Sequence, residues 1–193
     1  MTYATSVFPG YIEDIASRIQ DRINDMVNYP CMPLFIRLDI RFPPGYPHCG
    51  QNTQISALLR LLKEPNTVNG IKIHYVWVRE QHSIQPYYHV ILLVNGSIIQ
   101  NPHGLLHDAE RIWGQITGGN FPGLVHLCGH GYDLKTLLIH GHGFAENQIE
   151  NTYRILNFDE ALSDAIQRAP YLADGHQKRI RLYGCSRIFT KKI

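Results

Sequence analysis

IKIHYVWVREQHSIQPYYHVILLVNG, residues 71–96, contains two runs rich in Val, Ile, Tyr and Trp on either side of a short polar segment. Such residues favour β-strands, and Pro86 stands at the start of the second run, where its missing N–H does least harm. The pattern predicts a long β-hairpin that turns at residues 81–85. Because residues 90–94 are almost purely apolar, we expect the second strand to be central and covered on both faces.

Two ionisable residues stand at one end of this hairpin. Glu80 ends the first strand and His89 lies at the entrance of the second. We expect these side chains to face each other where the strands open to solvent. A carboxylate and an imidazole placed in this way can hold a metal ion or activate a water molecule. The alternative is a hydrogen-bonded histidine at a sheet edge, with a structural role only.

Before the hairpin, the sequence predicts two helices and a strand. Apolar residues at spacings of three and four over residues 12–27 indicate an amphipathic helix that ends at Pro30. Residues 34–42, LFIRLDIRF, alternate between apolar and mostly charged side chains, which predicts a strand with one buried face. A second helix covers residues 55–62, with Asn52 or Thr53 as its N-cap.

After the hairpin, a turn at residues 101–104 precedes a third helix over residues 105–116, which ends before Gly118. Short apolar runs predict strands at residues 124–127 and 137–139, and residues 158–172 form the last amphipathic helix. The order of elements predicts a single α+β domain over residues 1–193. Its central, mainly antiparallel sheet is flanked by helices.

The composition excludes several classes of protein. With 193 residues, of which 44% are hydrophobic and 18% charged, the chain is expected to form a globular domain. No apolar run approaches the roughly 20 residues that span a bilayer. The N-terminus lacks the pattern of a secretory signal, so we expect a cytoplasmic protein without membrane contact. The cysteines form no Cys-x-x-Cys pair and are expected to be free thiols: Cys31, Cys49, Cys128 and Cys185.

The C-terminal part combines a tyrosine with basic residues. At about 100° per residue, Tyr171 lies about 220° from Phe158, outside the apolar face of the last helix. A tyrosine in this position can be a nucleophile towards phosphate or an ordinary surface residue. The basic residues that follow can contact phosphate or form a solvated terminus. They are Lys178, Arg179, Arg181, Arg187, Lys191 and Lys192.

Several of these segments together resemble a known family. FIRLDIRFP, YVWVREQ, YYHVILLVNG, Trp113 and YLADGHQKRIRLYGCSR occur in this order between Phe35 and Arg187. They look like the YagK/YfjJ C-terminal domain family of prophages, plasmids and filamentous phages. That family is similar to the inovirus gene 2 type of replication protein and is related to the HUH endonucleases that start rolling-circle replication. The resemblance implies an HUH endonuclease-like fold and a single-stranded or hairpin DNA partner.

The resemblance also implies a metal site. The HUH motif has two histidines separated by one residue on a central strand, and both face the same side. Here the strand reads Tyr87-Tyr88-His89, so His89 is the second histidine and Tyr87 replaces the first. A third ligand, often Glu, precedes the first histidine by seven residues in many relatives, and Glu80 stands at that distance from Tyr87. Glu80 and His89 would then bind Mg²⁺ or Mn²⁺.

The family's nucleophile is similar to the tyrosine of a Tyr-Leu-Ala-Lys segment. This chain has Tyr171-Leu172-Ala173-Asp174, with an acidic residue where the family has lysine, and Lys178 follows one turn later. The resemblance implies that Tyr171 cleaves DNA through a phosphotyrosyl bond. It also implies that Lys178, Arg179, Arg181 and Arg187 hold the DNA backbone. A catalytically degenerate relative that binds single-stranded DNA without cleaving it is the alternative.

A third interpretation is a zinc-stabilised interaction module. Its potential ligands fall within seventeen residues, and zinc accepts both imidazole and thiolate. Their spacing matches no zinc module, and the same residues can instead form a histidine-rich loop near the substrate or simply be exposed to solvent. These residues are His126, Cys128, His130, His140 and His142.

Overall fold

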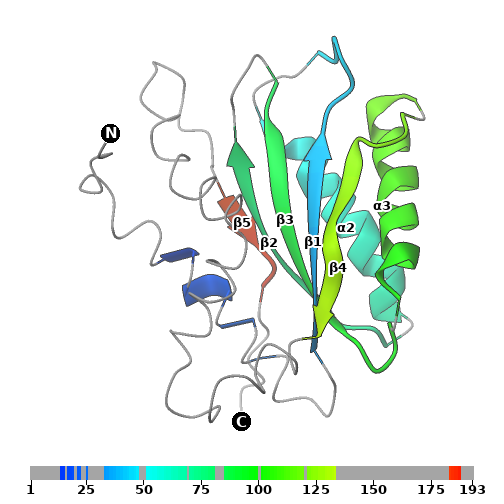
Figure 1. Ribbon diagram of the computed structural model, residues 1–193. Coiled ribbons are helices and arrows are strands. Elements are labelled where there is room, and N and C mark those ends of the chain that lie inside the picture. The colour runs from blue at the N-terminus through cyan, green and yellow to red at the C-terminus, as the bar shows by residue number, and fades with distance from the viewer. Residues whose placement is uncertain are drawn as a thin grey trace.

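Within the described residues, five strands form one sheet in which every neighbouring pair is antiparallel, in the order β4-β1-β3-β2-β5 (Figure 1). The strands are β1 (Pro33–Arg41), β2 (Ile73–Glu80), β3 (Tyr87–Asn95), β4 (Val125–Asp133) and β5 (Tyr183–Cys185). The computed structural model describes residues 14–15, 17–19, 21–22, 25, 33–47, 51–68, 70–80, 85–99, 101–119, 121–133 and 183–187. The α+β architecture expected from the sequence is confirmed.

The hairpin is the centre of the sheet. β2 and β3 pair from Ile73 opposite Val94 to Glu80 opposite Tyr87. β3 lies between β1 and β2, and each residue from Tyr88 to Val94 is buried. The apolar run therefore forms a strand covered on both faces, as its composition predicts.

Two helices cover one face of the sheet (Figure 1). α2 (Thr53–Val68) and α3 (Pro102–Thr117) pack against each other and against the even-numbered side chains of β1 and β3. α3 begins three residues earlier than the sequence predicts, because Pro102 occupies its first turn and Asn101 accepts a hydrogen bond from the backbone N–H of His103. It ends at Gly118, whose φ of 82° favours glycine, as expected.

The opposite face of the sheet is also largely buried. Alternation in β1 predicts a single buried face, but Phe35 and Arg37 on the other face are only 3% and 6% exposed. The described residues between 14 and 25 are helical, as predicted, and Ile15 and Ile19 are fully buried. Hydrophobic burial on both faces makes the sheet the middle layer of the fold.

A polar cluster connects these N-terminal residues to the sheet. His74 of β2 is buried, with Nε2 2.6 Å from Asp25 Oδ2 and Nδ1 3.1 Å from the hydroxyl of Ser186. Lys72 forms an ion pair with the same Asp25 oxygen at 2.5 Å. Burial lowers the pKa of His74 to about 4, although its hydrogen bond to Asp25 acts in the opposite direction.

The strands after α3 differ from the sequence prediction. β4 extends to Asp133, well beyond the expected residues 124–127. β5 was not predicted, because its three residues follow a basic segment and carry no alternating pattern. At Gly184 of β5, an added Cβ would lie 2.6 Å from the indole of Trp77, so glycine permits this close approach. The predicted strand at 137–139 and helix at 158–172 lie outside the described residues.

None of the helices described here has the length and apolar character needed to cross a membrane.

Candidate functional site

Strand register brings four polar side chains together on the face opposite α2 and α3. Asp39 of β1 lies directly opposite His89 of β3, and Tyr87 of β3 lies opposite Glu80 of β2. Since His89 and Tyr87 are two residues apart, both point to the same face. Glu80 is then the diagonal neighbour of His89, within reach of its side chain. Glu80 and His89 therefore face each other, as expected from the sequence, but both side chains are buried, so the expected opening to solvent is wrong.

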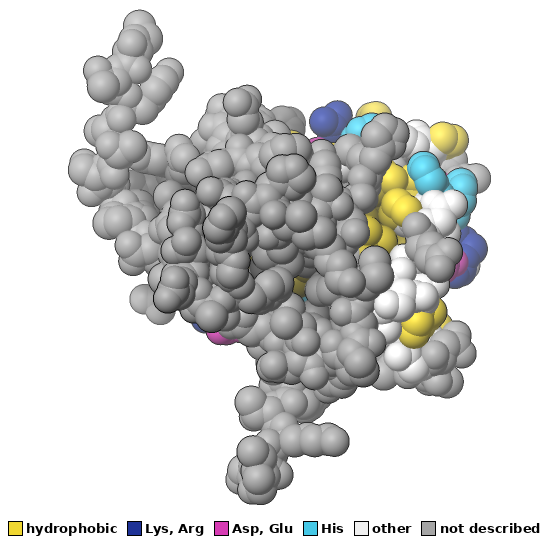
Figure 2. All heavy atoms as spheres, turned by 60° about the horizontal axis from the view of Figure 1, so that its bottom comes forward, with side chains coloured by type: hydrophobic (Ala, Val, Ile, Leu, Met, Phe, Trp, Pro, Cys, Tyr) yellow, Lys and Arg dark blue, Asp and Glu magenta, His cyan; other side chains and the backbone are white. Residues whose placement is uncertain are grey.

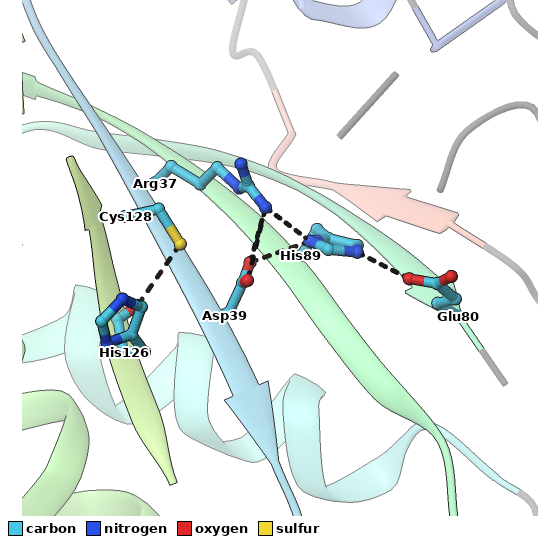
Figure 3. A network of polar contacts seen from close by, with 6 residues as sticks. All are labelled: Arg37, Asp39, Glu80, His89, His126 and Cys128. Atoms are coloured by element: carbon cyan, nitrogen blue, oxygen red, sulfur yellow. Dashed lines mark hydrogen bonds and ion pairs between the residues drawn. The ribbon is translucent and has the colours of Figure 1, made fainter. Parts of the chain in front are cut away.

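His89 is held between two carboxylates (Figure 3). Its Nδ1 atom is 2.8 Å from Asp39 Oδ1, and its Nε2 atom is 2.9 Å from Glu80 Oε2. The His89 side chain is 0% exposed, Glu80 is 5% exposed and Asp39 is 14% exposed. The histidine is therefore enclosed on a central strand and not at a sheet edge, and its partners are carboxylates from two neighbouring strands.

These contacts determine which protonation state of the imidazole is favoured. Burial alone lowers the pKa of His89, but the hydrogen bonds to Asp39 and Glu80 outweigh it and raise the pKa above its usual value. Burial likewise disfavours the charged form of Asp39, yet His89 and Arg37 keep its pKa below the usual range. Both carboxylates accept hydrogen bonds, so the ring nitrogens donate to them when no metal is bound.

Arg37 fixes the outer carboxylate. Its Nη2 atom lies 3.1 Å from Asp39 Oδ1 and 3.1 Å from His89 Nδ1, and its side chain is only 7% exposed. The guanidinium therefore contacts the Asp39–His89 hydrogen bond from one side. A buried arginine paired in this way restricts the rotation of the carboxylate, which in turn holds the imidazole.

Tyr87 stands at the position that the sequence resemblance assigns to the first histidine of the HUH motif. Its ring centre is 4.5 Å from that of His89, and the guanidinium carbon of Arg41 is 5.3 Å from the Tyr87 ring centre. Burial, together with the charges of Asp39 and Glu80, raises the pKa of Tyr87 to about 12. A phenol that stays protonated at neutral pH is a poor ligand for Mg²⁺ or Mn²⁺.

Glu80 and His89 fit a divalent ion as a two-residue ligand set. Carboxylate oxygen and imidazole nitrogen suit Mg²⁺ or Mn²⁺, and an ion between them would replace the 2.9 Å hydrogen bond that joins Nε2 to Oε2. Asp39 contacts the other ring nitrogen and therefore orients His89 from behind. Among the described side chains, no group of three or more His, Cys, Asp or Glu residues is arranged to hold a metal. Water and substrate oxygens would complete the coordination.

The zinc interpretation draws no support from the described part of its region. His126 and Cys128 lie on β4, next to Asp39 (Figure 3), and the Cys128 thiol lies 3.9 Å from the backbone oxygen of His126. Hydrogen bonding from Cys128 is one of the influences that lower the pKa of Asp39. His140 and His142 lie outside the described residues, and only the strand position of His130 is described.

Of the remaining predicted site residues, only Arg187 is among those that the structure describes. Tyr171, Lys178, Arg179 and Arg181 lie outside the described residues, so their positions relative to His89 are not assigned. Arg187 is exposed and follows β5.

Sequence reasoning missed Arg37 and Asp39. A signal for both was present, because two opposite charges stand on the same face of a strand whose other face is apolar. Their partner could not be identified, since the pairing of β1 with β3 joins residues fifty positions apart.

Comparison with models of known protein families gives a match over most of the chain. The model of the YagK/YfjJ C-terminal domain family matches residues 7–186, almost the whole chain. No match was found among curated proteins or among solved structures.

Proposed function

Because the chain belongs to the YagK/YfjJ C-terminal domain family, we propose that it is a rolling-circle replication initiator-like DNA nicking protein of a prophage, plasmid or filamentous phage. The observation that carries the proposal is the contact between His89 Nε2 and Glu80 Oε2 on the central hairpin. This is the pair of residues that the HUH resemblance assigns to a divalent metal. Their position on an antiparallel sheet agrees with that assignment.

In this proposal, Glu80 and His89 would hold Mg²⁺ or Mn²⁺, which would supply polarisation of the scissile phosphate and stabilisation of the transition-state charge. Asp39 accepts the Nδ1–H hydrogen bond and so leaves Nε2 directed at Glu80. His89 and Arg37 together keep Asp39 ionised, and Arg37 also holds the carboxylate in place. The arrangement holds the imidazole ring in place, and an ion at Nε2 would replace the proton that this nitrogen donates to Glu80.

Tyr171 supplies the nucleophile. Its hydroxyl oxygen forms a bond to phosphorus while the bond from phosphorus to the 3′ oxygen breaks. The phenolic proton is transferred, overall, to the departing 3′ oxygen. The products are a 5′-phosphotyrosyl bond and a free 3′-hydroxyl that a polymerase can extend.

A second candidate is a relative that binds single-stranded DNA without cutting it. Tyr87 favours this candidate, because its phenol replaces one of the two imidazoles of the HUH motif and packs between Arg41 and His89. Two side-chain ligands form a weaker site than three. Asp174, in place of the family's lysine, also brings a negative charge close to Tyr171.

A nicking assay separates the two candidates. The substrate is circular single-stranded DNA that carries the sequence on either side of this protein's own gene. With Mn²⁺, the wild type should produce linear strands, while Tyr171→Phe and wild type in EDTA should not. A protein that retains DNA binding in EDTA but never produces linear strands is the binding relative. Linear product from Tyr171→Phe would indicate a contaminating nuclease.

A further inference from the structure

We infer that Arg41 binds a backbone phosphate of single-stranded DNA beside the His89 centre, and that Tyr87 is the positioning residue that holds Arg41 there. This inference rests on the proposed function and assigns a substrate contact within the same site. Arg41 is the last residue of β1, and its side chain is exposed.

The register of the sheet places Arg41 next to the candidate metal ligands. Arg41 lies opposite Tyr87, and Asp39, two residues earlier on the same face, lies opposite His89. The guanidinium carbon is 5.3 Å from the centre of the Tyr87 ring, within the distance of a cation–π contact. The Tyr87 ring also contacts His89, two residues along the same strand, at 4.5 Å between ring centres. Tyr87 therefore bridges an exposed cation and the buried centre.

An exposed arginine is needed beside the His89 centre because the centre itself carries two carboxylates. Asp39 and Glu80 would repel a phosphate, while Arg37 is buried and already contacts Asp39. An exposed guanidinium beside them can neutralise the approaching phosphate and bind two of its oxygens at once. The described side chains visible in Figure 2 include hydrophobic, histidine, basic and acidic types.

The backbone of Arg41 forms two hydrogen bonds that do not involve its side chain. The side chain can therefore be mutated without removing them. Its N–H donates to the carbonyl of Leu124 at 2.8 Å, and its carbonyl accepts from the indole of Trp113 at 2.7 Å. Both bonds persist when the side chain is shortened. Arg41→Ala should therefore leave the fold intact.

The test is binding of a fluorescent single-stranded oligonucleotide, measured in EDTA over a range of salt concentrations. Arg41→Ala should weaken binding about tenfold at low salt, as expected for loss of one charged hydrogen-bonded contact. It should also reduce the salt slope by about 0.7, the value for one phosphate contact on a single strand. Arg60→Ala is the matched control, because Arg60 is also an exposed arginine and pairs with Glu64 on α2.

Two further variants separate positioning from general damage. Tyr87→Phe keeps the ring and should bind as the wild type does, whereas Tyr87→Leu removes the ring and should reproduce the loss seen for Arg41→Ala. Equal binding by Arg41→Ala and Arg60→Ala would overturn the assignment of Arg41 while leaving the proposed function standing. Equal loss in both Tyr87 variants would overturn the positioning role. If the wild type fails to bind single-stranded DNA, the proposed function and this inference both fall.

Discussion

Asp39 on β1 lies directly opposite His89 on β3, and its Oδ1 atom is 2.8 Å from the Nδ1 atom of the imidazole. This contact determines what the other side of the ring can do. Once Nδ1 donates to Asp39, the lone pair of a neutral imidazole is on Nε2, which faces Glu80. A carboxylate behind a metal-binding histidine fixes the ring and increases its basicity.

Asp39→Asn should therefore lower the affinity for Mn²⁺ by about 10- to 100-fold, the range found when such an outer carboxylate is changed. The affinity can be measured by titrating Mn²⁺ and recording the free ion by electron paramagnetic resonance. Asp108→Asn is the control, since Asp108 is an exposed aspartate that pairs with Arg111 on α3. A folded Asp39→Asn protein with the affinity of the wild type would show that Asp39 does not support a metal ligand.

The basic C-terminal segment makes a separate prediction. Reversing Lys178, Arg179 and Arg181 to Glu should remove most single-stranded DNA binding, because phosphate contacts release counterions and depend steeply on salt. Arg60→Glu combined with Arg111→Glu reverses two exposed arginines on the helical layer and should have little effect. If the C-terminal variant keeps the affinity and salt slope of the wild type, the segment is only a solvated terminus.

The buried His74 cluster predicts a pH dependence of stability. The pKa of His74 is about 4 in the folded protein, against about 6.5 when unfolded, so only the unfolded state binds this proton between these values. The contribution of His74 to stability is therefore fully present above pH 6.5. As the pH falls towards 4, protonation of His74 in the unfolded state lowers the free energy of unfolding by at most about 3 kcal/mol. Asp25 and Lys72, which contact each other beside His74, set the local charge.

Urea unfolding at pH 7, 6 and 5 measures this loss. In His74→Gln, the decrease between pH 7 and pH 5 should be smaller than in the wild type. The variant His103→Gln changes an exposed histidine on α3. Its free energy of unfolding should decrease as much as that of the wild type. The same decrease in all three proteins would mean that other groups account for the acid sensitivity.

Gly184 tests the attachment of β5. Gly184→Val should destabilise the protein by about 1–3 kcal/mol despite the high strand propensity of valine, because the new side chain meets the Trp77 indole. Gly104→Ala on α3 is the control: an added Cβ meets nothing within 4 Å, and alanine favours the helix by up to about 1 kcal/mol. The midpoint temperature of thermal unfolding should fall in Gly184→Val and rise in Gly104→Ala. A Gly184→Val protein as stable as the wild type would mean that Trp77 can move away from β5.

The sequence predicts the central hairpin and its helical cover because these depend on local patterns. β-branched and aromatic runs mark β2 and β3, and apolar spacing marks α2 and α3. The start of α3 was misplaced, since Asn101-Pro102 is compatible with both a turn and a capped helix. β5 was missed because three residues carry too little pattern to indicate a strand.

The candidate site was only half predictable for a different reason. Glu80 and His89 lie nine residues apart, joined by one turn, so a hairpin prediction brings them together. Asp39 and Arg37 join them through the pairing of β1 with β3, which is a long-range contact. The role of Arg41 depends on the same pairing, because the contact with Tyr87 crosses these two strands.

The central claim is that this chain cleaves single-stranded DNA through Tyr171 with help from Glu80 and His89. Mass spectrometry of the protein after incubation with Mn²⁺ and single-stranded DNA from its own element tests it most directly. The account predicts a Tyr171 peptide that carries a 5′-linked nucleotide in the wild type, strongly reduced in Glu80→Gln and absent in Tyr171→Phe. A wild-type protein that binds this DNA but never yields the adduct, or an adduct on another residue, would contradict it.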